Sequence, residues 1–185
     1  KDLNNEVSIV VINDASSQQI IDTYPNIENI YSFEIVNMKE NRGHARCIAS
    51  GLKYIFEKKE FDFVIPMDGD GEDRPEEIKN FIEISKQSGE KSLIGERVKR
   101  SEGIIFKTCY QFHKFLTLAF TGQSIKFGNF TCLSKSTVKK LLDEKATWNS
   151  FSGSLKKVEK ELVSMPSIRG KRYFGPSQMS FFNLL

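Results

Sequence analysis

The chain has 185 residues, three cysteines and a formal net charge of +3 at pH 7, with 39% hydrophobic and 28% charged residues. These values are ordinary for one globular domain with a hydrophobic core. No run of uncharged apolar residues reaches the roughly eighteen that a membrane-spanning helix needs, and Cys47, Cys109 and Cys132 lack the spacing of a zinc site or disulfide framework. We expect a soluble chain in a reducing cytoplasm.

Charge is distributed unevenly along the chain. Residues 1–90 contain ten Lys and Arg against eighteen Asp and Glu, whereas residues 91–185 contain seventeen against six. An acidic half can hold a divalent cation, and a basic half can meet phosphates or an anionic membrane surface. A solvated surface would give the same asymmetry. We expect no nucleic-acid partner, because the aromatic residues of the basic half recur at the spacing of a helical core.

The first half of the chain predicts alternating strands and helices. β-Branched and apolar runs predict strands, and apolar residues at helical spacing predict helices, one of which Pro75 opens. Such alternation is typical of an α/β fold with a mostly parallel sheet flanked by helices. The predicted strands are 7–12, 30–36, 61–67 and 92–95, and the predicted helices are 45–57 and 75–88.

The second half does not continue this alternation, and it has longer predicted helices and more basic residues. Its last part reads as a basic loop that leads into an apolar segment over 179–185, which could begin a helix that approaches a membrane. The predicted elements are a helix over 104–120, a strand over 125–133, and helices over 136–142 and 151–161.

Asp68 and Asp70 form the sharpest local signal in the sequence. They follow a predicted strand directly, and the carboxyl ends of strands are where open α/β sheets bind ligands. Two carboxylates on alternate residues can face one Mg²⁺ or Mn²⁺ and leave positions open for diphosphate oxygens, and Glu72 could add a third oxygen. An acidic turn with no ligand has the same composition, so these residues alone leave both interpretations open.

Four sequence blocks resemble family-2 glycosyltransferases, particularly the polyprenyl-phosphate sugar synthases. Residues 12–16 are similar to the family's "VDDGS", and residues 41–51 to "NxGHxxAxxxG". Residues 68–77 are similar to "DADLQDPPE", and residues 172–178 to "RxxGxSK", with Gln178 in place of the usual Lys. The order and spacing of the blocks carry the resemblance, because each block alone is weakly specific.

The resemblance implies an A-type glycosyltransferase fold with a Rossmann-like sheet, in a single domain over residues 1–185. Residues 1–96 would bind the nucleotide sugar, and residues 97–185 would form the acceptor side. The family's domain opens with a strand similar to "SVVIPVYNE", which has no counterpart before residue 7. We therefore expect this chain to lack that first strand.

The resemblance also implies the ligands of a donor site that holds Mg²⁺ or Mn²⁺ through its "DXD" block. The divalent ion would stabilise charge on the leaving diphosphate. The implied nucleotide-sugar ligands are Asp14, Asn41, Gly43, Asp68, Arg172 and Ser177. The implied metal ligands are Asp68, Asp70 and Glu72.

An acceptor-phosphate site is implied by residues 95–97, which look like the family's "GSR". Arg97, Arg100 and Lys107 would hold the phosphate of a lipid-linked acceptor at the cytoplasmic face of the membrane, and solvated surface charge is the alternative for the last two. Asp70 and Arg97 are the implied catalytic residues. Because a phosphate acceptor is already ionised at neutral pH, no strong general base is needed.

Two other functions stay open at this point. One is a family-2 transferase that acts on a glycan hydroxyl in capsule, O-antigen or lipopolysaccharide synthesis, with a base near Asp143 and Glu144. The other is an inactive relative that binds UDP or GDP without transferring a sugar. Acceptor trials separate the first from a lipid-phosphate enzyme, and turnover separates the second.

Overall fold

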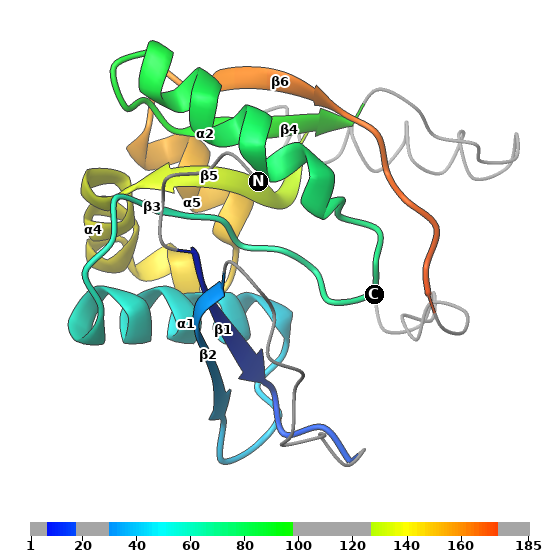
Figure 1. The fold of residues 1–185 in the computed structure, drawn as a ribbon. Helices are drawn as coiled ribbons and strands as arrows, with labels where there is room; N and C mark the ends of the chain where they lie inside the picture. The colour runs from blue at the N-terminus through cyan, green and yellow to red at the C-terminus, as the bar shows by residue number, and fades with distance from the viewer. Residues whose placement is uncertain (1–6, 18–29, 98–126, 174–185) are drawn as a thin grey trace, which may run out of the picture.

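The computed structural model describes residues 7–17, 30–97 and 127–173 (Figure 1). The predicted helix over 104–120 and the apolar segment over 179–185 lie outside these residues. The described strands are β1 Val7–Asn13, β2 Ile30–Asn37, β3 Phe63–Val64, β4 Leu93–Arg97, β5 Phe127–Ser134 and β6 Val163–Ser167. The described helices are α1 His44–Lys58, α2 Ile78–Gln87, α4 Lys135–Asp143 and α5 Phe151–Val158, with short 3₁₀ helices η1 Pro75–Glu77 and η2 Lys145–Trp148.

The strands form two sheets. β1 and β2 pair in parallel, and the other four strands lie in the order β3-β5-β4-β6. In the larger sheet β4 and β6 are parallel, whereas β5 runs antiparallel to both β3 and β4. The α/β fold with parallel pairs flanked by helices is therefore confirmed, and the larger sheet is mixed.

Two strands differ from the sequence prediction, and each has a proline in or next to it. The strand predicted over 61–67 is reduced to Phe63–Val64, because Pro66 has no N–H to donate to a ladder. β6 was not predicted from the sequence, and it contains Pro166. It lies at the edge of the sheet, where proline is tolerated.

The larger sheet has a hydrophobic core on each face. On one face α2 places Phe81 against Phe130, with ring centroids 4.7 Å apart, and Leu93, Cys132 and Met165 complete that cluster. The opposite face packs against α1, α4 and α5. Its buried side chains are Leu52, Val64, Ile94, Phe127, Leu133, Val138, Leu141, Phe151 and Leu155.

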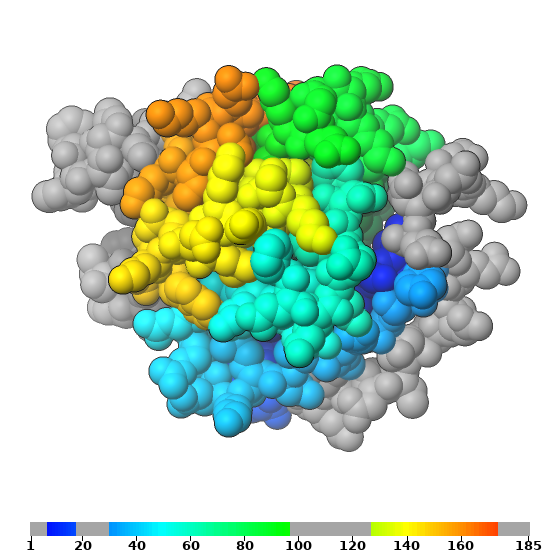
Figure 2. Space-filling model, turned by 90° about the vertical axis from the view of Figure 1, so that its left-hand side faces the viewer, coloured from blue at the N-terminus to red at the C-terminus, as the bar shows by residue number. Residues whose placement is uncertain are grey.

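The amino end of β3 is closed by helices and ion pairs. Figure 2 looks onto this end, where α1 and α4 pack side by side. Lys135 at the start of α4 pairs with Glu60 just before β3. The chain that follows β3 runs away from α4 to the opposite end of the sheet (Figure 1).

Helix α1 joins the two sheets. Leu52 on α1 belongs to the core of the larger sheet, while Gly51 faces Ile12 of β1. A Cβ at Gly51 would lie 2.8 Å from Ile12 Cγ1, closer than side chains pack. Glycine therefore sets the distance between α1 and β1. No helix of the described residues is long and apolar enough to cross a membrane.

We expect Gly51→Val to lower the free energy of unfolding by about 1–3 kcal/mol, because the added side chain overpacks the seam against Ile12. Urea unfolding followed by circular dichroism measures the change. Lys53→Val on the exposed side of α1 is the control, since it introduces the same β-branched residue into the same helix. Equal effects of the two substitutions would contradict a steric role for Gly51.

Candidate functional site

Four segments linked by contacts contain most of the described residues that the sequence singled out. They are the loop after β1, the turn over 41–43 before α1, the acidic loop over 65–73 after β3, and residues 168–173 after β6, which we call the strap. Loops that follow the carboxyl ends of strands are the usual ligand-binding edge of an α/β sheet. The edge is therefore the candidate site.

Asp14 fastens the loop after β1 to the turn before α1. Its Oδ1 accepts a hydrogen bond from the Arg42 N–H at 2.8 Å, and its Oδ2 accepts one from the Gly43 N–H at 2.9 Å. Gly43 is the N-cap of α1 at φ +86°, a conformation that favours glycine. Asn41 Oδ1 also accepts from the Gly43 N–H, at 3.2 Å. The structure thus brings Asp14, Asn41 and Gly43 together in what we call the Asp14 clamp, and their contact with a nucleotide stays a prediction.

The acidic loop is shaped by its own carboxylates. Asp70 Oδ1 accepts a hydrogen bond from the Glu72 N–H at 2.9 Å, and the nearly buried Asp73 accepts one from the Asp68 N–H at 2.8 Å. Gly71 turns the chain between Asp70 and Glu72 at φ +88°. These bonds fix the positions of Asp68 and Asp70 relative to the end of β3. Asp73 was not singled out from the sequence.

The strap lies across the acidic loop and brings two arginines to it. The Gly170 N–H donates to the Glu72 carbonyl at 2.8 Å, and the Tyr173 N–H donates to the Asp70 carbonyl at 3.0 Å. Arg172 Nη2 lies 2.9 Å from Asp70 Oδ2, and its Nε lies 3.4 Å from Glu72 Oε1. Arg169 pairs with Glu72 as well. The sequence indicated Arg172 but not Arg169.

A second group of side chains lies beside Asp68. His44 is the first residue of α1, and its Nε2 is 3.7 Å from Asp68 Oδ1. The Asn129 side-chain amide of β5 contacts the same ring nitrogen. Three elements therefore meet at this point of the site. Asn129 was not singled out from the sequence, although a polar residue in an otherwise apolar run is the signal that could have found it.

The acidic loop presents two partly exposed carboxylates, Asp68 and Asp70. In residues 7–17, 30–97 and 127–173, no three His, Cys, Asp or Glu side chains gather as a preformed cage. Asp68 and Asp70 each keep about a quarter of their side-chain surface exposed, at 25%. Mg²⁺ typically binds one or two carboxylates and takes its other ligands from water and phosphate. Asp68 and Asp70 are suited to that role, although Asp70 is paired with Arg172 and Glu72 with both arginines.

Two predicted acceptor residues and the predicted donor ligand Ser177 lie outside the described part of the chain. Arg100, Lys107 and Ser177 fall in the undescribed ranges. Arg97 is the last residue of β4, where it pairs in register with Ser167, just before the strap. The backbone of Arg97 therefore lies next to the start of the strap.

Glu144 has structural contacts at the junction of α4 and η2. Its carboxylate pairs with Lys157 and accepts the Ala146 N–H at the start of η2. The hydrogen bond from Lys157, and then that from Ala146, hold the pKa of Glu144 below its usual range. A low pKa makes a carboxylate a poor proton acceptor. These contacts argue against Glu144 as a general base.

Known proteins resemble the chain along its whole length. Residues 2–145 match the family described as "Glycosyl transferase family 2". The chain is 22% identical, over all of its length, to the undecaprenyl-phosphate 4-deoxy-4-formamido-L-arabinose transferases of Proteus mirabilis (strain HI4320) and Photorhabdus laumondii subsp. laumondii. It covers 56% and 57% of those proteins, so it spans about half the length of the curated relatives it matches. The family match takes in the Asp14 clamp, the 41–43 turn and the whole acidic loop, and the chain belongs to glycosyl transferase family 2.

Proposed function

We propose that this chain carries the donor-binding part of an inverting glycosyltransferase that moves a sugar from UDP or GDP to a polyprenyl phosphate. The observation that supports it most is the acidic loop, held by the strap beside the clamped turn at the start of α1. The two relatives are named as undecaprenyl-phosphate transferases, which favours a lipid phosphate as the acceptor class. We further propose one domain over residues 1–185, with its acceptor side in residues 97–185, working at the cytoplasmic face of a membrane.

The nucleoside end of the donor would lie along Asp14 and the turn over 41–43. Gly43 carries no side chain, and a Cβ there would meet nothing within 4 Å. Space over a backbone turn, together with carboxylate and amide oxygens, suits a ribose and a base edge. The diphosphate would then extend from this turn toward the acidic loop and the arginines of the strap.

The acidic loop and the strap would act on the diphosphate. Asp68 and Asp70 would hold Mg²⁺ or Mn²⁺, which when bound stabilises the negative charge that grows on the leaving diphosphate. Arg172 would contribute a planar fork suited to phosphate oxygens. Such groups accelerate transfer because they are already aimed at the place where charge develops.

The acceptor would attack without the help of a strong base. A phosphate monoester is ionised at neutral pH, so its oxygen can attack the anomeric carbon directly on the side opposite the leaving diphosphate. The new bond forms as the bond to the β-phosphate breaks, which inverts the configuration. Arg97, with Arg100 and Lys107, would hold the acceptor phosphate in place for this attack.

The first test is a calorimetric titration of UDP and of GDP into the protein with Mn²⁺ and then with a chelator. We expect one nucleotide to bind in a Mn²⁺-dependent manner. Asp70→Asn should weaken that binding at least tenfold, because it removes a charge while keeping the oxygen that accepts the Glu72 N–H. Asp62→Asn, an exposed acid before β3, is the control for the lost charge. Wild-type affinity in Asp70→Asn would contradict the metal-site proposal.

Asp14→Asn tests the clamp at the turn before α1. An amide is uncharged and offers only one acceptor oxygen, so Asp14 can no longer accept from both the Arg42 and the Gly43 N–H, and the clamp loses a charge-assisted hydrogen bond. We expect the affinity for the preferred nucleotide to fall about tenfold. The need for Mn²⁺ should persist, because the acidic loop is untouched. Loss of the Mn²⁺ requirement would show that the two groups do not act separately.

Arg97→Ala tests the division between donor and acceptor sides. We expect a higher concentration of polyprenyl phosphate for half-maximal transfer, with little change in nucleotide affinity, because the guanidinium would contact only the acceptor. Initial rates at varied acceptor and calorimetry with the nucleotide measure the two effects. An equal loss of nucleotide affinity would contradict the division. Transfer to a soluble glycan instead of the lipid phosphate would favour a hydroxyl acceptor.

A further inference from the structure

Arginines of the strap pair with Asp70, a proposed cation ligand, and with the neighbouring Glu72. Asp70 Oδ2 is 2.9 Å from Arg172 Nη2, and Glu72 is contacted by both Arg172 and Arg169. The side chains are only partly exposed, 15% for Glu72 and 25% for Asp70. Ion pairs with limited access to water are screened less than surface pairs. Positive charge at this loop is therefore built into the fold.

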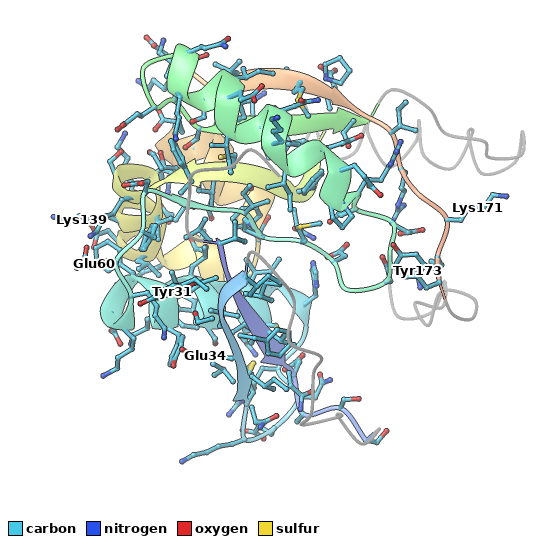
Figure 3. The ribbon with its side chains drawn as sticks, viewed as in Figure 1. Tyr31, Glu34, Glu60, Lys139, Lys171 and Tyr173 are labelled. Carbon is cyan, nitrogen blue, oxygen red and sulfur yellow. The ribbon has the colours of Figure 1, made fainter. Side chains whose placement is uncertain are left out.

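The backbone of the strap is seated on the loop independently of these charges. Two backbone hydrogen bonds join the segments, from Gly170 to Glu72 and from Tyr173 to Asp70. A Cβ at Gly170 would lie 2.5 Å from the Gly71 carbonyl oxygen, and one at Gly71 would lie 2.5 Å from the Tyr173 ring. Two glycines thus let the segments approach closely. Figure 3 shows Lys171 and Tyr173 at this end of the molecule.

A guanidinium and a divalent cation compete for the same carboxylate oxygen. A metal ion would approach Asp70 Oδ2 to about 2.0–2.1 Å, well inside the present distance to Arg172 Nη2. Repulsion between the two positive groups adds to the competition. Because the strap is held through its backbone, the long Arg172 side chain can leave Asp70 while residues 170 and 173 stay seated. A donor diphosphate beside the cation would then offer oxygens to its planar fork.

We propose that Arg172 occupies the cation's position on Asp70 and is transferred to the donor diphosphate when the cation binds. Arg169 stays on Glu72 and keeps the strap in place, so Arg172 is a positioning residue with two alternative partners. This inference rests on the proposed function, since it needs both a divalent cation and a diphosphate. It adds that one side chain links the two binding events: the cation frees Arg172, and Arg172 then strengthens diphosphate binding.

Titration of Mn²⁺ alone separates this exchange from a purely structural role. We expect Arg172→Gln to bind Mn²⁺ about tenfold more tightly than the wild type, because Asp70 no longer has a competing partner. The same variant should bind the preferred nucleotide more weakly in saturating Mn²⁺, because the diphosphate loses a guanidinium. A structural defect would weaken both. Calorimetry measures both affinities, and thermal melting checks that the variant is folded.

Arg74→Gln is the matched control. Arg74 belongs to the same loop region and pairs with Glu76 at 3.7 Å, rather than with Asp70 or Glu72. The Arg74→Gln variant loses one positive charge, as Arg172→Gln does. Its affinities for Mn²⁺ and for the nucleotide should stay within about twofold of the wild type. Arg172→Lys is the second variant, and it keeps the charge without the fork. It should leave Mn²⁺ affinity close to that of the wild type while weakening nucleotide binding.

The outcomes distinguish the exchange from the function on which it rests. Equal or weaker Mn²⁺ affinity in Arg172→Gln overturns the exchange, and the proposed function stands if nucleotide binding still requires Mn²⁺. A tenfold gain in Mn²⁺ affinity in Arg74→Gln as well also overturns the exchange, because the loss of any nearby positive charge would then explain the effect. Absence of both Mn²⁺ and nucleotide binding in the wild-type protein overturns the exchange and the proposed function together.

Discussion

The crowding of carboxylates at the carboxyl end of β3 is the constraint on which the site depends. Neighbouring negative charges repel one another, and partly buried carboxylates need N–H donors or cations. The loop meets this need from two sources. Its own backbone donates N–H groups to Asp70 and Asp73, and the strap brings Arg169 and Arg172. The chain after β6 thus neutralises the charge of a loop almost a hundred residues earlier, while its backbone is held there by hydrogen bonds of its own.

Local sequence predicted the parts of the fold that local interactions determine. The Asp68–Asp70 pair and the Asp14 loop could be located because a polar segment follows directly on an apolar strand. Helix α1 was predicted from spacing that the burial of Leu52 explains, and the helix over 75–88 from Pro75 at its start. The family match agrees with the resemblance inferred from these blocks.

The features that sequence did not predict depend on contacts between distant residues. Arg169 meets Glu72 across 97 positions, and Asn129 meets His44 across 85. No periodicity within one segment indicates which distant basic residue will reach an acidic loop. The antiparallel direction of β5 and the edge position of β6 belong to the same class, because strand pairing is decided by the assembled sheet. Sequence therefore located the carboxylates of the site better than their partners.

The two-sheet arrangement has a consequence for local stability. Among the described strands, β1 and β2 hydrogen-bond only to each other, so side-chain packing on α1 is a principal attachment of this pair to the larger sheet. Units joined by a packed seam can open separately from the rest of a domain. A ligand that spans Asp14 and the first turn of α1 would hold the seam closed, and ligation would raise the amide-exchange protection of β1 and β2. Ligand binding at the Asp14 clamp would then be detectable as increased protection of the whole β1–β2 pair.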